Sequence, residues 1–203
     1  MKTPAAVPEH GTECPKPRVR DRMFETACAL FYEHGINNVG VDAIASAAGT
    51  NKMSFYRSFA SKDELVAEYL RERERVLWQW WDGIVAPYAG DPRRQIEALF
   101  DGVISRCRGQ NVWGCAAANA AAEIRDEGHP ALAVIHGQKA ELRRRFRALA
   151  AALGAREPEV LGDALTLLFD GASTAKLTFA CKDGPYVNVA KTVKALLDAQ
   201  LAQ

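Results

Sequence analysis

Hydrophobic residues recur three or four positions apart along most of the chain, which is the spacing that one buried face of an α-helix requires. The pattern is clear from Met23 to Phe31 and again from Leu65 to Ile84. Glycine and proline interrupt it at Gly35, Gly49, Ala86-Pro87, Gly109, Gly128 to Pro130, Gly154 to Pro158 and Gly184-Pro185. No stretch alternates with the two-residue period of a β-strand. The sequence therefore predicts an all-α fold of about nine helices.

The positions of these interruptions predict a small head followed by a larger body. Turns at Gly35 and Gly49 lie close together, so we expect three short helices before residue 60 and longer ones, of roughly 15 to 25 residues, after it. Ser61 and Glu64 have the spacing of a capping box at the start of a connecting helix. The expected segments are a flexible arm over 1–17, a three-helix head over 18–60, a connecting helix over 61–86 and a C-terminal domain over 87–203.

Composition adds that a nucleic-acid site would have to be local. The 203 residues are 48% hydrophobic, enough for a sizeable core, and the 26 basic and 25 acidic residues leave a net charge of only +1. The first 17 residues hold four of the nine prolines and no apolar run, which excludes a secretory signal. Later apolar stretches end before the ~18 residues of a membrane span. We therefore expect a cytoplasmic protein with no membrane partner.

The residues that carry catalysis or bind metals do not occur in the required patterns. No GxSxG, HExxH or phosphate-binding glycine loop is present, so we expect no enzyme, no catalytic residue and no cofactor. The histidines lack the spacing to cysteine of a zinc site, and the odd number of scattered cysteines argues against a disulfide framework. These residues are His10, His34, His129 and His136, and Cys14, Cys28, Cys107, Cys115 and Cys181.

The stretch that follows Gly40 has the pattern of two short helices joined by a tight turn. A helix from Val41 to Ala48 would place Val41, Ile44 and Ala45 on one buried face. Gly49 suits the left-handed conformation that ends such a helix. A second helix starting near Asn51 would turn Phe55 and Phe59 inward, because residues four apart share a face.

The outward surface of this second helix is the candidate DNA-binding surface. A recognition helix enters the major groove by its N-terminal end, where backbone N–H groups and the dipole suit phosphates. Tyr56 can donate its hydroxyl to a phosphate, Lys52 and Lys62 supply charge, and Arg57 can reach a guanine edge or a phosphate. The candidate residues are Thr50, Asn51, Lys52, Met53, Ser54, Tyr56, Arg57 and Lys62. A helical hairpin with a solvated basic face is the alternative.

Three arginines, Arg18, Arg20 and Arg22, precede the first apolar positions. They suit contact with phosphate or with an adjacent minor groove. Solvated charges without a function are the alternative, and the sequence does not choose between the two.

Residues 48–65, A-G-T-N-K-M-S-F-Y-R-S-F-A-S-K-D-E-L, resemble the signature of the TetR family, and the resemblance covers about residues 20 to 66. It implies a dimeric transcription regulator with a helix-turn-helix head and a body that answers to a small molecule. Two positions depart from the family pattern. Gly40 stands where Ser or Thr usually caps the second helix and contacts a phosphate, and Met53 stands where a small residue is common.

Beyond about residue 87 the chain resembles the family only loosely. The resemblance implies a pocket between the middle helices and a four-helix dimer interface made by the last two helices of each protomer. Two broad apolar stripes are consistent with this interface, since they exceed what one small core needs. They comprise Val160, Leu161, Leu165, Leu168, Phe169, Ala172, Ala175 and Phe179, and Val189, Val193, Leu196, Leu197 and Leu201.

The candidate pocket residues are aromatic and polar side chains expected to face the interior of the body. They are Trp81, Phe100, Ile104, Cys107, Trp113, Asn119, His136, Phe169 and Asp170. Ordinary core packing is the alternative for each of them.

The resemblance implies a repressor that leaves a palindromic operator when an effector in the body moves the connecting helix and changes the spacing of two heads. Two alternatives remain open. One keeps the DNA-binding head but uses Cys107 and Cys115, which flank a glycine-containing turn, as a redox trigger. The other is a helical ligand carrier without a role at DNA.

Overall fold

The computed structural model describes residues 18–109, 113–179 and 184–201, and within these ranges it contains helices and no strands. The predicted arm, His10, Cys14 and Cys181 lie outside the described residues. The described part of the chain contains nine α-helices, which are α1 Val19–His34, α2 Val41–Ala47, α3 Lys52–Ser58, α4 Lys62–Val85, α5 Pro92–Cys107, α6 Ala116–Glu123, α7 Pro130–Ala152, α8 Pro158–Thr178 and α9 Val189–Leu201. Two short 3₁₀ helices, η1 Ala86–Tyr88 and η2 Pro185–Asn188, precede α5 and α9. The all-α prediction is confirmed.

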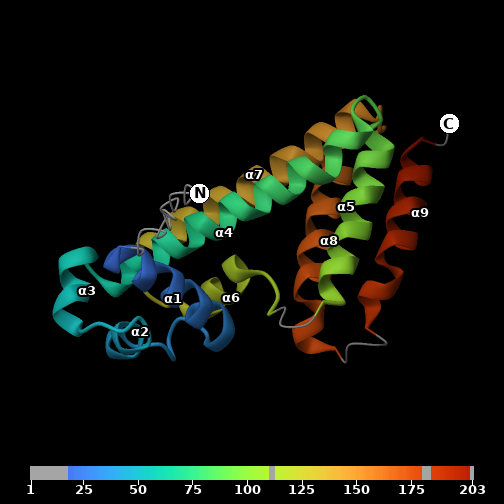
Figure 1. Cartoon of the computed structure of the whole chain (residues 1–203). Coiled ribbons are helices and arrows are strands. Elements are labelled where there is room, and N and C mark those ends of the chain that lie inside the picture. The colour runs from blue at the N-terminus through green and yellow to red at the C-terminus, as the bar shows by residue number, and fades with distance from the viewer. Residues whose placement is uncertain (1–17, 110–112, 180–183, 202–203) are drawn as a thin grey trace, which may run out of the picture.

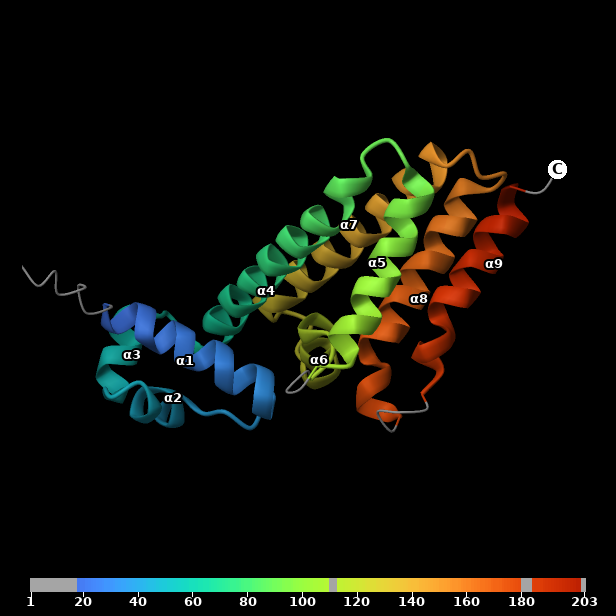
Figure 2. The same cartoon turned by 45° about the vertical axis from the view of Figure 1, so that its right-hand side comes forward.

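The molecule is elongated, with the head at one end (Figure 1). Helices α1, α2 and α3 form this head, and α4 runs from it alongside α7 into the body. Helices α5, α8 and α9 pack at the far end (Figure 2). The short α6 lies between head and body, where it contacts both α4 and α7. No described helix is long and apolar enough to cross a membrane.

A single buried cluster joins the head to the body. Met23, Ala27 and Phe31 follow one another at intervals of four on the inner face of α1 and are at most 3% exposed. The same cluster continues through Tyr69 of α4 and Ala120 of α6. Because apolar burial is the main source of stability, this shared core ties the orientation of the head to α4 and α6.

Helix lengths differ from the prediction in three places, one of which is α9, with 13 residues where 15 to 25 were expected. Helix α1 has 16 residues and is not short, because Gly35 marks only its end. Helix α6 has only eight residues, although longer helices were expected in the body. It ends before Ile124, where the backbone becomes extended, and the turn at Gly128 and Pro130 follows.

Candidate functional site

The turn between α2 and α3 is closed by backbone hydrogen bonds. Gly49 has φ +66°, the left-handed conformation expected from the sequence, and the N–H of Thr50 donates to the carbonyl of Ala45 at 2.9 Å. Asn51 then caps α3, since its side-chain oxygen accepts from the N–H of Ser54 at 2.9 Å. The start of α3 is therefore held in a defined geometry.

The two faces of α3 differ as the sequence pattern predicts. Phe55 and Phe59 are 0% and 5% exposed, with ring centroids 5.4 Å apart. Met53 and Tyr56 are 73% and 54% exposed on the other side. An exposed aromatic ring beside a basic residue, Arg57, suits contact with a nucleic-acid backbone.

Seven of the candidate DNA-binding residues lie between Thr50 and Arg57, at the start of α3 and along it, and the eighth, Lys62, is the first residue of α4. Asn51, Lys52, Met53, Tyr56 and Arg57 are exposed, while Thr50, Ser54 and Lys62 are half-buried. Ser54 donates its hydroxyl to Asn51 at 3.1 Å in addition to the backbone bond, so the polar groups of this pair act first as a cap for α3.

An acidic residue that the sequence analysis did not consider lies beside the candidate surface. Lys52 Nζ lies 3.0 Å from Asp42 Oδ2, and this hydrogen bond raises the pKa of Lys52 above its ordinary value. Both side chains are more than half exposed, so water screens the pair. A DNA phosphate that binds the ammonium group of Lys52 would have to replace the carboxylate of Asp42.

The arginines near the start of α1 do not behave as one group. Arg20 donates two hydrogen bonds to Glu68 of α4, at 2.7 and 2.8 Å, and lies over the ring of Phe59. It joins α1, α3 and α4, which is a structural role that neither of the two earlier alternatives named. Arg18 is exposed at the N-cap of α1, and Arg22 is half-buried within this helix.

Gly40 lacks the hydroxyl group that Ser or Thr would supply at this position, and the surrounding space does not require a glycine. Gly40 is the N-cap of α2, with no side-chain hydrogen bond to the helix. Its φ of −85° is open to any residue, and an added Cβ would meet nothing within 4 Å. A hydroxyl residue would therefore fit at this position.

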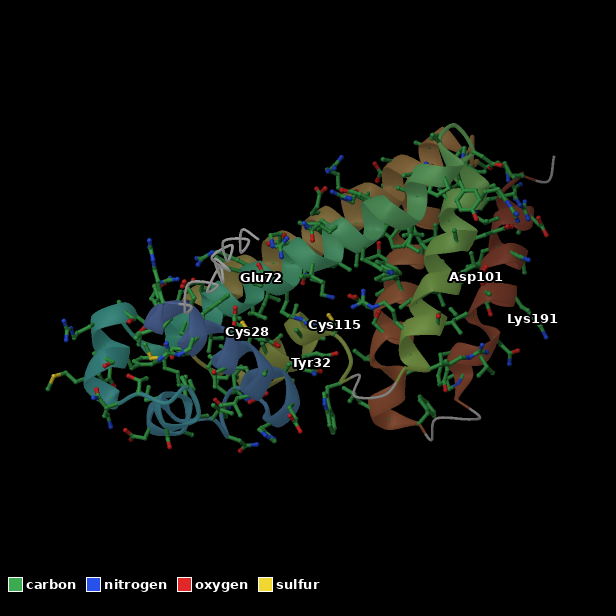
Figure 3. All side chains as sticks on the ribbon, in the orientation of Figure 1. Cys28, Tyr32, Glu72, Asp101, Cys115 and Lys191 are labelled. Carbon is green, nitrogen blue, oxygen red and sulfur yellow. The ribbon has the colours of Figure 1, made fainter. Side chains whose placement is uncertain are left out.

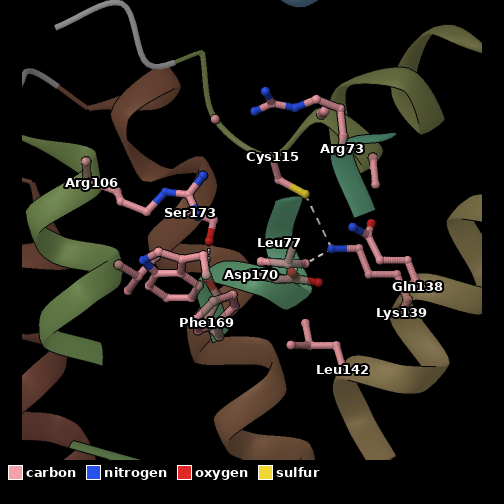
Figure 4. Close-up of a pocket in the computed structure, with 16 residues that line it drawn as sticks. Arg73, Leu77, Arg106, Cys115, Gln138, Lys139, Leu142, Phe169, Asp170 and Ser173 are labelled. Carbon is pink, nitrogen blue, oxygen red and sulfur yellow. Dashed lines mark hydrogen bonds and ion pairs between the residues drawn. The ribbon is translucent and has the colours of Figure 1, made fainter. Parts of the chain in front are cut away.

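A cavity of about 80 Å³ lies in the body, next to the N-terminus of α6 (Figure 4). Residues of α4, α5, α7 and α8 also line it. The lining residues are Arg73, Leu77, Trp80, Val103, Arg106, Cys107, Gly114, Cys115, Ala116, Ala117, Gln138, Lys139, Leu142, Phe169, Asp170 and Ser173.

Three of the nine candidate pocket residues, Cys107, Phe169 and Asp170, line this cavity. The others lie elsewhere. Trp81, Phe100 and Ile104 are buried in the core of the body, which fits the alternative of ordinary packing.

Two further candidates, Trp113 and Asn119, border a different space, and Trp113 and His136 are exposed. Trp113 and Asn119 line a second cavity, of about 140 Å³, where α1, α4 and α6 meet. Trp113 is 42% exposed, and His136 is exposed on α7, so the expectation that these two face the interior does not hold. Aromatic or polar character does not by itself tell which side of a helix a residue occupies.

Five polar residues that line the first cavity were not among the predicted site residues, namely Arg73, Arg106, Gln138, Lys139 and Ser173. A signal for two of them was present. Arg73 lies four positions from both Tyr69 and Leu77, and Gln138 lies between Ile135 and Leu142 at helical spacing. A polar side chain within an apolar stripe is an indication of a lined cavity.

Charges in the first cavity are only partly paired. Lys139 Nζ lies 2.6 Å from Asp170 Oδ1 and 3.6 Å from Cys115 Sγ. Burial alone would lower the pKa of Lys139, but Cys115 and Asp170 outweigh it and the pKa is raised. Within the described residues, Arg73 and Arg106 have no carboxylate partner within 4 Å and lie instead over the rings of Tyr32 and Trp80, at 4.3 and 5.1 Å.

Hydrogen bonds connect the cavity region to the head on both sides of α6. Figure 3 labels Tyr32 of the head and Cys115, which precedes α6. Before α6, the hydroxyl of Tyr32 accepts from the N–H of Trp113 at 3.1 Å. At the last residue of α6, Glu123 accepts from the N–H groups of Ile36 and Asn37 at 3.2 and 2.7 Å. The loop between α1 and α2 is thus held by the same short helix that borders the cavity.

The cysteines of the redox alternative both line the cavity, and neither is in a disulfide. The Cys107 thiol donates to the carbonyl of Ala172 at 3.2 Å, whereas Cys115 lies beside Lys139. A third thiol, Cys28, is in the head, where burial raises its pKa to about 12 and keeps it protonated at neutral pH.

Comparison with known proteins extends the resemblance beyond the head. A family model described as "Bacterial regulatory proteins, tetR family" matches residues 24–69. The transcriptional repressor KstR2 of Mycobacterium tuberculosis is 37% identical over 81 residues, which cover 40% of either chain. The repressor DhaR of a Mycobacterium species is 28% identical over 106 residues, 52% of either chain. The matched part of this chain therefore spans about half or less of these curated relatives.

Solved structures match over nearly the whole length. A TetR-type transcriptional regulator of Streptomyces avermitilis is 35% identical with a TM-score of 0.73, covering 92% of this chain and 100% of its own. SCO4454, a TetR-family regulator of Streptomyces coelicolor, is 27% identical with a TM-score of 0.76, covering 91% and 96%. The named relatives are transcriptional regulators rather than enzymes, as the sequence predicted. The chain belongs to the TetR family of bacterial transcriptional regulators.

Proposed function

We propose that this protein is a cytoplasmic homodimeric repressor that binds a palindromic operator and releases it when a small molecule occupies the cavity of the body. The observation that carries the proposal is the position of α6. Its first residues, Ala116 and Ala117, line the cavity, and its last residue, Glu123, holds the loop before α2. A displacement of the first residues of α6 would therefore be transmitted along a single helix to the loop before α2.

DNA binding is supported by the exposed face of α3. This face presents Met53, Tyr56 and Arg57 beyond a helix start that Asn51 caps. In the proposed complex, the N-terminal end of α3 enters the major groove and Tyr56 donates to a phosphate. A second head, about 34–36 Å away, would occupy the next groove on the same side of the duplex.

A second copy of the chain is the proposed occupant of the outer face of α8 and α9. Leu167, in the middle of α8, is 74% exposed, and Val160 and Leu177 on the same helix are 58% and 47% exposed. A groove of about 460 Å³ between α8 and the start of α9 is lined mainly by apolar side chains and threonines. Exposed apolar residues on one helix face support a symmetric interface, which a palindromic operator requires.

Release is proposed to follow from small movements of α4 and α6. Arg73 of α4 both lines the cavity and lies over Tyr32 of the head, so an occupant that attracts Arg73 weakens this contact. The two heads then no longer match the spacing of two major grooves. A coupling free energy of about 1–3 kcal/mol between the sites would change operator affinity by roughly 5- to 150-fold.

Selection from a random duplex library by the purified full chain at moderate salt tests the proposal. The expected outcome is enrichment of a palindromic site, bound by two protomers, with a preference of at least about 10³ over unselected duplex. Enrichment of no sequence, with weak binding that salt does not affect, would refute the DNA-binding part of the proposal and favour the ligand carrier.

A further inference from the structure

The first cavity carries more positive than negative charge. Arg73, Arg106 and Lys139 reach it from α4, α5 and α7, and Asp170 of α8 supplies its single carboxylate. Lys139 and Asp170 neutralise each other at 2.6 Å. Two guanidinium groups therefore remain without a counter-ion among the described residues.

These guanidinium groups are positioned by aromatic rings and repel each other. Arg73 lies over Tyr32 and Arg106 over Trp80. Desolvation, followed by the charge of Arg73, lowers the pKa of Arg106, which means that its charged form is less stable in the folded protein than in water. Arg106 retains exposed surface, so this desolvation is partial. An anion between the two groups would remove the repulsion.

The start of α6 adds a partial positive charge on the same side of the cavity. Cys115, the N-cap of this eight-residue helix, makes no side-chain capping bond, and Ala116 and Ala117 border the cavity. Helix N-termini present unpaired N–H groups that favour anions.

A buried amide gives an independent indication of a ligand. Gln138 is 7% exposed and lines the cavity, and its Oε1 atom has no hydrogen-bond partner. Figure 4 shows the side chain next to Lys139 at the edge of the cavity. An unpaired buried acceptor is destabilising, and only a donor can satisfy it. Because Oε1 itself is closed off from the cavity, the amide must turn toward the cavity to meet a donor of the ligand, and the gain of this missing bond favours that turn.

The remaining walls and the volume limit the size of the occupant. Leu77, Leu142 and Phe169 contribute apolar side chains to the wall of the cavity. One water molecule needs about 10–15 Å³ of such a cavity. A cavity of about 80 Å³ therefore holds a ligand of only a handful of non-hydrogen atoms. A polycyclic molecule does not fit without rearrangement.

We propose that this cavity binds a short carboxylate that carries a hydroxyl or amide N–H donor near its acid group. The carboxylate is placed between Arg73 and Arg106, the donor bonds to Oε1 of Gln138, and the short apolar part packs on Leu142 and Phe169. The identification of this molecule as the effector rests on the proposed function, whereas its binding does not.

The test measures thermal melting of the full chain with sodium salts of short carboxylates, among them butyrate and 3-hydroxybutyrate, at constant ionic strength. The matching neutral alcohols, among them 1,3-butanediol, serve as uncharged controls. The expected result is a rise in Tm with carboxylates that the alcohols do not produce, and a larger rise with the hydroxylated acid. Equal Tm values with acids and alcohols across the set would overturn the proposal.

Variants locate the binding site. Arg106→Gln should weaken carboxylate binding by about tenfold or more, because a charged hydrogen bond is lost. Arg125→Gln is the matched control, since Arg125 is exposed just beyond the other end of α6. Gln138→Leu should remove the preference for the hydroxylated acid and keep the affinity for butyrate. Unchanged binding in the Arg106 variant would mean that the acid binds elsewhere and would also overturn the proposal.

Measurement of operator affinity with and without the acid distinguishes failure of this inference from failure of the proposed function. Binding of the acid with no effect on operator affinity would leave the ligand assignment intact and contradict the release mechanism. Failure of the protein to bind any operator would contradict the proposed function and leave the melting result unaffected.

Discussion

The guanidinium of Arg73 lies 4.3 Å from the centre of the Tyr32 ring. Arg73 belongs to α4 and lines the cavity of the body, whereas Tyr32 belongs to α1 of the head. The hydroxyl of Tyr32 also accepts from the N–H of Trp113, in the segment that leads into α6. A side chain that lines the proposed ligand cavity is thus in direct contact with the helix-turn-helix head, and this contact adds to the one made by Glu123.

Substitution of Glu123 by Gln tests the contact between α6 and the head. The carboxylate accepts from the N–H of Ile36 through Oε1 and from the N–H of Asn37 through Oε2. Glutamine keeps one uncharged acceptor oxygen and replaces the other oxygen with an NH2 group, which only donates, so at least one of the two bonds is lost and the other is weakened. We expect faster amide hydrogen exchange at these two positions and a free energy of unfolding lower by about 1 kcal/mol. Glu127→Gln, at an exposed position in the following turn, is the control. Equal protection in both variants would show that Glu123 does not hold the loop.

The ion pair of Lys52 and Asp42 predicts opposite effects of two substitutions on DNA binding. Lys52→Ala should weaken binding to every duplex and reduce the slope of log K against log salt by about one unit per head. Asp42→Asn should strengthen binding, because it releases Lys52 and removes a negative charge from the surface. Salt titrations of duplex affinity check both. An unchanged slope for Lys52→Ala would mean that Lys52 does not contact a phosphate.

Leu167 provides the test of the dimer. Because this side chain is 74% exposed in the single chain, Leu167→Asp should leave the protomer folded while placing a charge in the proposed interface. We expect a shift from dimer to monomer in sedimentation equilibrium. Tyr88→Asp, at a 37% exposed aromatic outside α8 and α9, should not change the assembly. A Leu167 variant that stays dimeric would exclude this face as the interface.

The pH dependence of stability should report the contacts of Glu141. Hydrogen bonds from Arg144, at 2.6 Å, and Arg145, at 2.8 Å, lower the pKa of this carboxylate from 4.5 to about 2. Since the folded pKa lies below the unfolded value, the stabilisation is present above about pH 4.5 and is lost as the pH falls toward 2. Urea unfolding should therefore show Glu141→Gln less stable than the wild type at pH 7, with a smaller difference near pH 2.5. A difference that does not change with pH would contradict this assignment.

The head was predictable because its signals are local. Gly49, Asn51, Phe55 and Phe59 lie within eleven consecutive positions and determine the turn, the cap and the buried face of α3 through contacts with near neighbours. Ser61 likewise caps α4 by accepting from the N–H of Glu64 at 3.0 Å. Such features depend on short-range spacing, which one sequence displays fully.

The cavity was less predictable because its residues come from separate helices. Arg106 and Lys139 have the appearance of ordinary solvated charges, and only the packing of α5 against α7 and α8 turns them toward a common space. The pairing of Arg20 with Glu68, 48 positions apart, is equally invisible in the local pattern. Long-range ion pairs depend on tertiary geometry, so hydrophobic periodicity carries no information about them.

The most direct test of the account is the affinity of the purified protein for its selected duplex and for a scrambled duplex over a series of salt concentrations. We predict a preference for the selected duplex of at least about 10³ at moderate salt, and a linear fall of log K with log salt for both. Equal, weak affinity for the two duplexes, with a slope near zero, would contradict the assignment of α3 as a DNA-recognition helix.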